Sequence, residues 1–496
     1  MRSNHRPVIL LLLSPLLFSL TTALGFNWGT SSSHPLPPSK VVTGLLRANN
    51  ITKVKLADAN ADVLESLSGT GISVIVGVPN EMLETLNSSK KAAESWVHDN
   101  VTRYFSGGGV GSGVRIEYIA IGDEPFLLSY GQQFQPFVIG AAMNIQLALI
   151  TAKLTNKIKV IVPCSFDVFE YNSTNVLNSN STVNSSSTIP LPSKAHFRND
   201  LNKTITELLF FLKKQGSPFV VDFNPFSSFQ QSKNLSIDYF LFHPKARAIT
   251  DGHNKYNNFF DASIDTMVTS LSKTGFGEME IIIGRIGWPT DGAINATTAI
   301  AEKFMKGLVD HLHSKDIKKH PLETYIFSLL DEDQRSITTG NIERHWGLFT
   351  FDGQAKYNVD LGQGSKELVN AHNVDYLPSK WCVVNNNKDL SNVSASFMDA
   401  CSNADCTALS PGGSCAGVGW PGNISYAFNS YYQQHDQRGD SCDFGGLGLI
   451  TTVDPSIGNC RYAITLRTSF APDKDGRLVR WTMVLSVSTF LAFTWF

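Results

Sequence analysis

Strand-like and helix-like segments alternate along the first three quarters of the chain, and this alternation limits the possible folds more than any other feature. Eight short runs rich in β-branched and aromatic residues read as strands: 25–29, 53–58, 73–78, 117–122, 157–163, 219–224, 280–285 and 324–330. Helical patterns lie between them, for example over 137–154 and 197–215. Eight strands with seven crossovers in about 340 residues predict an α/β fold, a (β/α)8 TIM barrel.

A doubly wound open sheet is the alternative to the barrel. That fold would carry a glycine-rich nucleotide loop after its first strand, and the chain has none there. With 41 basic and 43 acidic residues and no block of Lys or Arg, the chain also gives no electrostatic reason to expect nucleic acid. We therefore expect no nucleic acid, no metal and no other cofactor.

The cysteines separate a second, smaller unit from the barrel. Cys164 stands alone in the first part, and six cysteines crowd the last quarter: Cys382, Cys401, Cys406, Cys415, Cys442 and Cys460. In a secreted chain this density predicts a small disulfide-rich module. A zinc site is the rival interpretation, but no Cys-X2-Cys pair or histidine cluster supports it. Cys164 lies beside a strand and is predicted to be a buried free thiol.

Both ends of the chain carry processing signals. Arg2, His5 and Arg6 precede an apolar run over 8–20, and small residues follow as far as Ala23. This order is typical of a secretory signal peptide, with cleavage after Ala23 or Gly25.

The apolar run over 481–496 ends the chain without a basic stop-transfer segment. It is shorter than the roughly 20 residues of a membrane-spanning helix. A polar spacer separates it from the small residues Ser469 and Ala471, which matches a glycosylphosphatidylinositol attachment signal with Ser469 as the lipidation site. An ordinary frayed terminus and a true membrane span are the alternatives.

These features predict four segments: a signal peptide over 1–23, the barrel over 24–375, the disulfide-rich module over 380–465, and a linker with anchor signal over 466–496. A secreted chain with many Asn-X-Ser/Thr sequons is expected to be a glycoprotein. The acceptor asparagines are Asn50, Asn87, Asn100, Asn172, Asn180, Asn184, Asn202, Asn234, Asn295, Asn392 and Asn423. The low-complexity stretch 171–193 is predicted to be a surface loop after the fifth strand.

Chemistry in a (β/α)8 barrel gathers at the carboxyl ends of the strands. The polar residues predicted to lie there are Asp58, Asp123, Glu124, Asp222, Asn224, Arg285, Asp331 and Glu332. A carboxylate at such a place can equally cap a helix or pair with a base. Arg285 is the unusual member, because an arginine directly after a buried strand needs a partner.

Long ordered motifs resemble plant glycoside hydrolase family 17. They include "GFNWGTSSSHPLPPSK" (25–40), "VGVPNEML" (76–83), "GWPTDG" (287–292) and "RHWGLFTFDG" (344–353). The resemblance implies a (β/α)8 barrel of the retaining endo-β-1,3-glucanases, which act on the O-glycosyl bonds of β-1,3-glucan.

The cysteine-rich part resembles the plant X8 module, carbohydrate-binding module family 43, in "WCVVNNN" (381–387) and "SCDFGGLGLIT" (441–451). This resemblance implies binding of β-1,3-glucan. It also implies the bridges Cys382–Cys442, Cys401–Cys406 and Cys415–Cys460, one of fifteen possible pairings.

Retaining glycosidases use one carboxyl group as acid/base and a second as nucleophile, about 5–5.5 Å apart. By the resemblance Glu124 is the proton donor, and Arg285 stands where the family has its nucleophilic glutamate. Arginine stays protonated and does not attack an anomeric carbon. The resemblance further implies substrate contacts at the remaining cleft positions: Asp123, Asp222, Asn224, Trp288, Glu323 and Glu332.

Two of these positions depart from the family in charge. Asp123 and Asp222 each replace an asparagine, and Asn224 replaces a tyrosine. Because two new anions accompany the new cation, we expect Arg285 to face Glu124 and at least one of Asp123 or Asp222, and to lower the pKa of Glu124.

Another carboxylate in the nucleophile's role would restore hydrolysis. Glu280 lies five residues before Arg285, so an unbroken strand would turn it toward the helices. Asp222 is an inward candidate, with nothing in the sequence to place it at attack distance.

The leading interpretation is a monomeric, glycosylphosphatidylinositol-anchored protein on the extracellular face of the plasma membrane and in the cell wall. It would bind β-1,3-glucan (callose) with impaired hydrolysis. An active endo-β-1,3-glucanase with a relocated nucleophile is the alternative. A structural wall protein without tight glucan binding is the third possibility.

Overall fold

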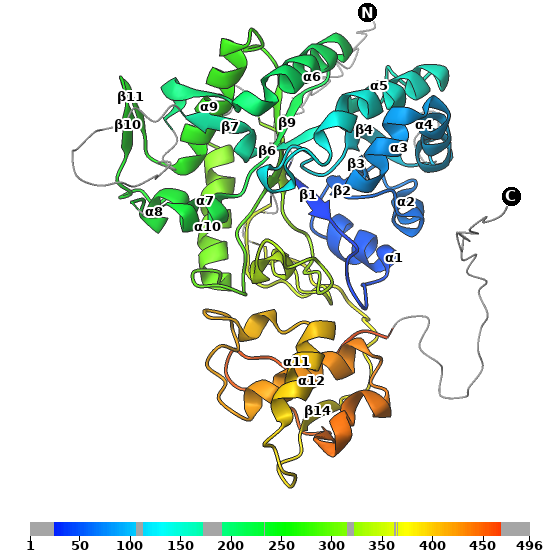
Figure 1. Cartoon of the computed structure of the whole chain (residues 1–496), viewed down its shortest axis with the longest axis vertical. Coiled ribbons are helices and arrows are strands. Elements are labelled where there is room, and N and C mark those ends of the chain that lie inside the picture. Colours follow the sequence, from blue (N-terminus) through cyan, green and yellow to red (C-terminus); the bar gives the residue numbers. More distant parts are fainter. Residues whose placement is uncertain are drawn as a thin grey trace, which may run out of the picture.

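The computed structural model describes residues 24–105, 113–171, 191–232, 234–314, 322–361, 364 and 366–467. Figure 1 shows a large unit, coloured blue to green, and a smaller yellow-to-orange unit below it. The predicted signal peptide, the anchor signal with Ser469 and most of the 171–193 segment lie outside the described residues. Among the residues that are described, no helix has the length and apolar character needed to cross a membrane.

The large unit is a barrel of parallel strands. The sheet order is β5-β4-β3-β2-β1-β13-β12-β9-β6. The strands span β1 Leu24–Trp28, β2 Lys53–Leu56, β3 Ser73–Val78, β4 Arg115–Ile121, β5 Lys159–Ile161, β6 Pro163–Ser165, β9 Phe219–Asp222, β12 Ile281–Ile286 and β13 Thr324–Ile326. Only Val162 separates β5 from β6, which lie at the two ends of this order. The two pieces form one interrupted strand that completes the ring, so the predicted (β/α)8 barrel is confirmed.

Helices cover the outside of the ring between successive strands (Figure 1). They are α1 Pro38–Lys40, α2 Ala61–Leu67, α3 Leu83–Ser88, α4 Lys90–Val97, α5 Gln135–Thr151, α6 Asn202–Gln215, α7 Pro225–Gln231, α8 Ile237–Phe240, α9 Phe259–Lys273 and α10 Thr298–Leu312. In α6 the residues Ile205, Leu208 and Leu212 recur at helical spacing and are buried. The helix ends at Gly216, whose φ of 62° is left-handed, as glycine allows.

The interior of the barrel is a packed core. Alternate positions of the strands deliver apolar side chains to the axis: Ile75, Ala120, Ile161, Val220, Ile282 and Tyr325. The opposite face of each strand packs against the helices in a larger cluster. Because side chains fill the middle of the barrel, a substrate has access only to its rims.

The small unit is a disulfide-bonded domain. Strand β14 (Trp381–Val384) pairs antiparallel with β15 (Gly448–Thr451), helix α12 (Gly422–Gln434) packs against β14, and helix α11 (Val393–Asn403) packs against α12. Three bridges join Cys382–Cys442, Cys401–Cys406 and Cys415–Cys460, which confirms the predicted connectivity. Cys164 is free and buried in the barrel, also as predicted.

Candidate active site

A β-bulge in β12 directs Arg285 into the barrel mouth, the rim where the carboxyl ends of the strands meet. Ile283 pairs with Val221 and Arg285 pairs with Asp222, so Gly284 and Arg285 together span a single step of β9. A bulge of this kind re-aims the side chain that follows it. A Cβ on Gly284 would collide with Asp222 and Val220. Glycine at this position therefore leaves room for the charged groups at the mouth.

Arg285 binds two carboxyl groups from the residues that follow β4. Its Nη1 donates to Glu124 Oε2 at 3.0 Å, and its Nη2 donates to Asp123 Oδ1 at 2.7 Å. The guanidinium also lies over the ring of Phe327, 4.5 Å from the centroid. The predicted pairing of Arg285 with Glu124 and Asp123 is confirmed.

Asp222 has a different main partner. Lys55, on β2, reaches both of its carboxylate oxygens at 3.0 and 2.8 Å and donates to the Gly284 carbonyl at 3.3 Å. Arg285 Nε lies 3.7 Å from Asp222 Oδ2, too far for a hydrogen bond. Both side chains of the Lys55–Asp222 pair are almost fully buried. The mouth therefore contains a second cation, Lys55, that the sequence analysis missed. Asp222 balances the charge of Lys55 more directly than it balances the charge of Arg285.

The pKa of Glu124 is raised, contrary to the expectation from the sequence. Burial is the largest cause, and the charges of Asp222 and Asp123 add to it. Together they raise the pKa to about 8 against the opposing effect of Arg285. Burial acts in the same direction on Asp123, but there Arg285 and Lys55 prevail and lower the pKa to about 2. The prediction considered the nearby arginine alone and was wrong because desolvation of the carboxyl group is the larger effect.

The charges at the mouth balance when Glu124 holds its proton. Asp123 and Asp222 then supply two anions, and Arg285 and Lys55 supply two cations. Glu124 has a left-handed backbone with φ of 49°, a conformation that costs about 1–3 kcal/mol for such a residue. A protonated carboxylic acid held in a strained conformation at a barrel mouth is suited to general acid catalysis.

The free energy of unfolding is expected to depend on the protonation of Glu124. Its pKa in the fold, about 8, lies above its ordinary value of 4.5. Between these values the folded state retains a proton that the unfolded state releases, so stability falls as pH rises through this window. Thermal unfolding of the wild type and of Glu124→Gln, measured from about pH 5 to pH 8.5, should show a steeper decline for the wild type. Parallel curves would contradict the raised pKa.

Glu332 lies near the mouth as predicted. It is 2 % exposed, its Oε1 accepts a hydrogen bond from the Ser31 amide at 2.9 Å, and its Oε2 lies 3.5 Å from Arg335 Nη1. The Arg335 guanidinium lies 4.8 Å from the centroid of Phe327, the ring that Arg285 also contacts. The loop after β13 thus supplies a carboxylate and a further cation beside Arg285.

Glu323 lies at the other end of the barrel. It directly precedes β13, and its carboxylate accepts hydrogen bonds from Lys53 Nζ at 2.6 Å and from the Tyr325 hydroxyl at 2.7 Å. Lys53 is the first residue of β2, so this cluster lies at the amino ends of the strands. The predicted role of Glu323 in the substrate cleft was wrong, because chemistry in this fold takes place at the carboxyl ends.

Two other predicted substrate contacts have structural roles. Trp288 is 1 % exposed, packs against Phe226 and Phe304, and donates its indole N–H to the Asn295 carbonyl. Asn224 caps α7, where its Oδ1 accepts from the Ser227 amide at 3.0 Å. Trp288 offers no free ring face to a sugar, so its assignment to the substrate site was wrong.

The structure is that of a (β/α)8 barrel protein with carboxyl groups at the barrel mouth, joined to a small disulfide-bonded domain. The sequence model for glycosyl hydrolases family 17 matches residues 24–361, and the X8 domain model matches residues 380–449. The chain belongs to glycosyl hydrolases family 17, the family of the plant glucan endo-1,3-β-glucosidases, and carries an X8 domain.

Two plant proteins are similar to nearly the whole chain, and a solved structure is similar to about two thirds of it. The chain is 58 % identical over 466 residues to glucan endo-1,3-beta-glucosidase 9 of Arabidopsis thaliana, covering 93 % of each chain. It is 39 % identical to glucan endo-1,3-beta-glucosidase 5 of the same plant, covering 95 % of this chain and 94 % of the relative. Among solved structures, CJP38, a beta-1,3-glucanase and allergen of Cryptomeria japonica pollen, matches with a TM-score of 0.61 at 32 % identity. That match covers 69 % of this chain and 100 % of CJP38.

Proposed function

We propose that this protein binds β-1,3-glucan at the cell surface and that its hydrolytic activity is impaired. The observation that carries the proposal is the pair of hydrogen bonds from Arg285 to Glu124 and Asp123. By resemblance Arg285 occupies the position of the nucleophile, and a guanidinium cannot form the glycosyl-enzyme intermediate that a retaining mechanism requires.

None of the neighbouring carboxylates is well placed to replace the nucleophile. Asp222 is buried against Lys55, and Asp123 is bound by Arg285. Glu332 accepts from the Ser31 amide and faces Arg335. Each of these three carboxylates is paired with a cation, which lowers its nucleophilicity. The mouth therefore retains a proton donor in Glu124, while Asp222, Asp123 and Glu332 are each held by another group.

The raised pKa of Glu124 favours the second candidate function, an active endo-β-1,3-glucosidase. A group protonated near neutral pH can still assist departure of the leaving sugar. This candidate requires another nucleophile. Asp222, whose charge acts on Glu124, is the inward candidate, and it would first have to leave Lys55.

Glucan binding is supported by the family and by the X8 domain. The relatives are named for β-1,3-glucan as their substrate. The resemblance of the small domain to carbohydrate-binding module family 43 implies the same ligand. Loss of the nucleophile leaves the rest of the barrel mouth in place, so recognition of the polysaccharide can persist without cleavage.

The location that we propose follows from the two terminal signals. A secreted, lipid-anchored monomer would present both domains to the cell wall. The described sequon asparagines Asn50, Asn202, Asn234 and Asn392 are exposed and accessible to glycosylation, whereas Asn87, Asn100, Asn295 and Asn423 are half-buried. Asn172, Asn180 and Asn184 lie outside the described residues.

Retention on insoluble β-1,3-glucan tests this function. The purified ectodomain, incubated with insoluble β-1,3-glucan and in parallel with cellulose, is expected to sediment with the first polysaccharide only. Soluble laminarin should release the bound ectodomain from the insoluble glucan by competition. Equal recovery in the supernatant with both polysaccharides would contradict glucan binding and favour a purely structural wall protein.

A further inference from the structure

The X8 domain is docked on barrel loops at the carboxyl ends of the strands, among them the loop after β12, the strand that carries Arg285, and the loop after β13. In the loop after β12, the Asp291 carboxylate accepts from the amide and the hydroxyl of Ser414 at 2.7 and 2.5 Å. In the loop after β13, Asn341 donates to the Ser410 hydroxyl at 2.6 Å. Figure 1 shows the X8 domain directly below the yellow-green segment that contains this second loop. The small domain therefore contacts the carboxyl-end face of the barrel, where the candidate site lies.

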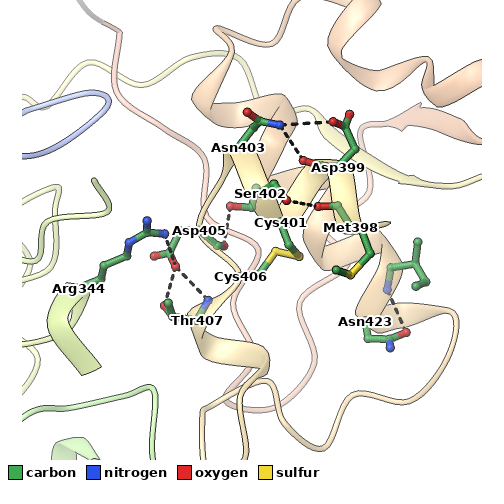
Figure 2. The surroundings of a disulfide bond; sticks show 12 residues. Arg344, Met398, Asp399, Cys401, Ser402, Asn403, Asp405, Cys406, Thr407 and Asn423 are labelled. Carbon is green, nitrogen blue, oxygen red and sulfur yellow. Dashed lines mark hydrogen bonds and ion pairs between the residues drawn. A yellow bond between two sulfur atoms is a disulfide. The ribbon is translucent and has the colours of Figure 1, made fainter. Parts of the chain in front are cut away.

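An ion pair between Arg344 and Asp405 lies in this interface. Arg344 Nη1 lies 3.2 Å from Asp405 Oδ1, and both side chains are largely buried. Asp405 is held by its own domain, because the same oxygen accepts from the Thr407 amide at 3.0 Å and the Thr407 hydroxyl at 2.5 Å. The next residue, Cys406, is bridged to Cys401 (Figure 2). Asp405 is thus held in position by its own domain and can orient the Arg344 side chain.

Arg344 connects this anchor to the barrel mouth. Its Nε donates to the Arg335 carbonyl at 3.1 Å, and its own carbonyl accepts from the Glu332 amide at 3.3 Å. Arg335 contacts the Phe327 ring on which Arg285 also lies. An unbroken chain of contacts therefore runs from the X8 domain to the groups around Arg285.

We propose that the X8 domain acts as a positioning element of the barrel mouth, through the Asp405–Arg344 pair. By holding Arg344 it fixes the backbone of Glu332 and Arg335, and with it the rim on which a β-1,3-glucan chain would lie. Binding of glucan in the barrel would then depend on X8 even where the sugar does not touch that domain. This inference rests on the proposed glucan binding.

Asp405→Asn tests the proposal. Asparagine keeps the oxygen that accepts from Thr407 and removes the charge that holds Arg344. The affinity of the full ectodomain for soluble laminarin, measured by calorimetry, is expected to fall by about 2- to 30-fold. The matched control is Asp399→Asn on α11. The Asp399 carboxylate accepts a hydrogen bond from Asn403 of its own domain (Figure 2), so its replacement should leave the affinity unchanged.

A double-mutant cycle with Arg335→Ala separates positioning from an independent X8 contribution. If Asp405 acts through Arg335, the double variant should lose little more affinity than Arg335→Ala alone. Additive losses, or an unchanged affinity of Asp405→Asn, would overturn the proposal while leaving glucan binding intact. A wild-type ectodomain that binds no laminarin would instead refute the proposed function, and this inference with it.

Discussion

Arg285→Glu is expected to give the ectodomain laminarin-hydrolysing activity at least about 10²-fold above its unmodified background. The substitution removes the guanidinium and places a second carboxylate opposite Glu124, whose raised pKa keeps it protonated near neutral pH. A retaining mechanism needs these two groups and no cofactor. Release of reducing ends from laminarin measures the gain.

Two companion variants make this prediction specific. Adding Glu124→Gln to Arg285→Glu should abolish the new activity, because the proton donor is lost. Adding Asp123→Asn should increase it, because Asp123 would otherwise stand unpaired beside two glutamates once its arginine partner is removed. A stable Arg285→Glu protein that binds laminarin and shows no hydrolysis with or without Asp123→Asn would contradict the account of the mouth.

Lys55→Met is expected to lower the free energy of unfolding by about 3–5 kcal/mol. Asp222 is almost fully buried, and both of its oxygens receive hydrogen bonds from Lys55. Removing the cation leaves a buried carboxylate without its main partner. Urea unfolding at neutral pH, followed by tryptophan fluorescence, measures the loss.

Lys53→Met is the matched control for Lys55→Met. Lys53 lies two residues earlier on the same strand, and its ion pair with Glu323 is more exposed, so a smaller loss is expected. Combining Lys55→Met with Asp222→Asn should recover most of the stability, because the unpaired charge is then absent. Equal losses for the two lysines would contradict the buried-pair interpretation.

Strand positions and the convergence at the mouth could be predicted from the sequence. The β-branched runs lie where the strands are. Because the carboxyl ends of the strands meet at one face, the sequence also predicted that Arg285 lies close to Glu124 and Asp123, as the hydrogen bonds show. The disulfide connectivity followed from the resemblance to X8. Lys55 could also have been predicted to point inward, because polar and apolar residues alternate in Lys53-Val54-Lys55-Leu56.

The bulge in β12 was not predicted, although Gly284 inside the β-branched run 281–286 is the kind of residue that often marks one. The orientation predicted for Glu280 relative to Arg285 holds only in an unbroken strand, and β12 has a register shift after Ile283. Glu280 is nevertheless remote from the mouth, since its carbonyl accepts from the Phe219 amide at the start of β9. The raised pKa of Glu124 likewise could not be predicted from the sequence, because it depends on how deeply the carboxyl group is buried and on how close Asp222, Asp123 and Arg285 lie.

The most direct test of the central claim is an assay of the unmodified ectodomain for hydrolysis of laminarin under conditions in which it binds that glucan. With Arg285 bound to Glu124 and Asp123, we predict bound polysaccharide and no release of reducing ends above a protein-free control. Sustained release of reducing ends that is lost on Glu124→Gln would contradict the claim, and would identify the protein as an active glucanase with a different nucleophile.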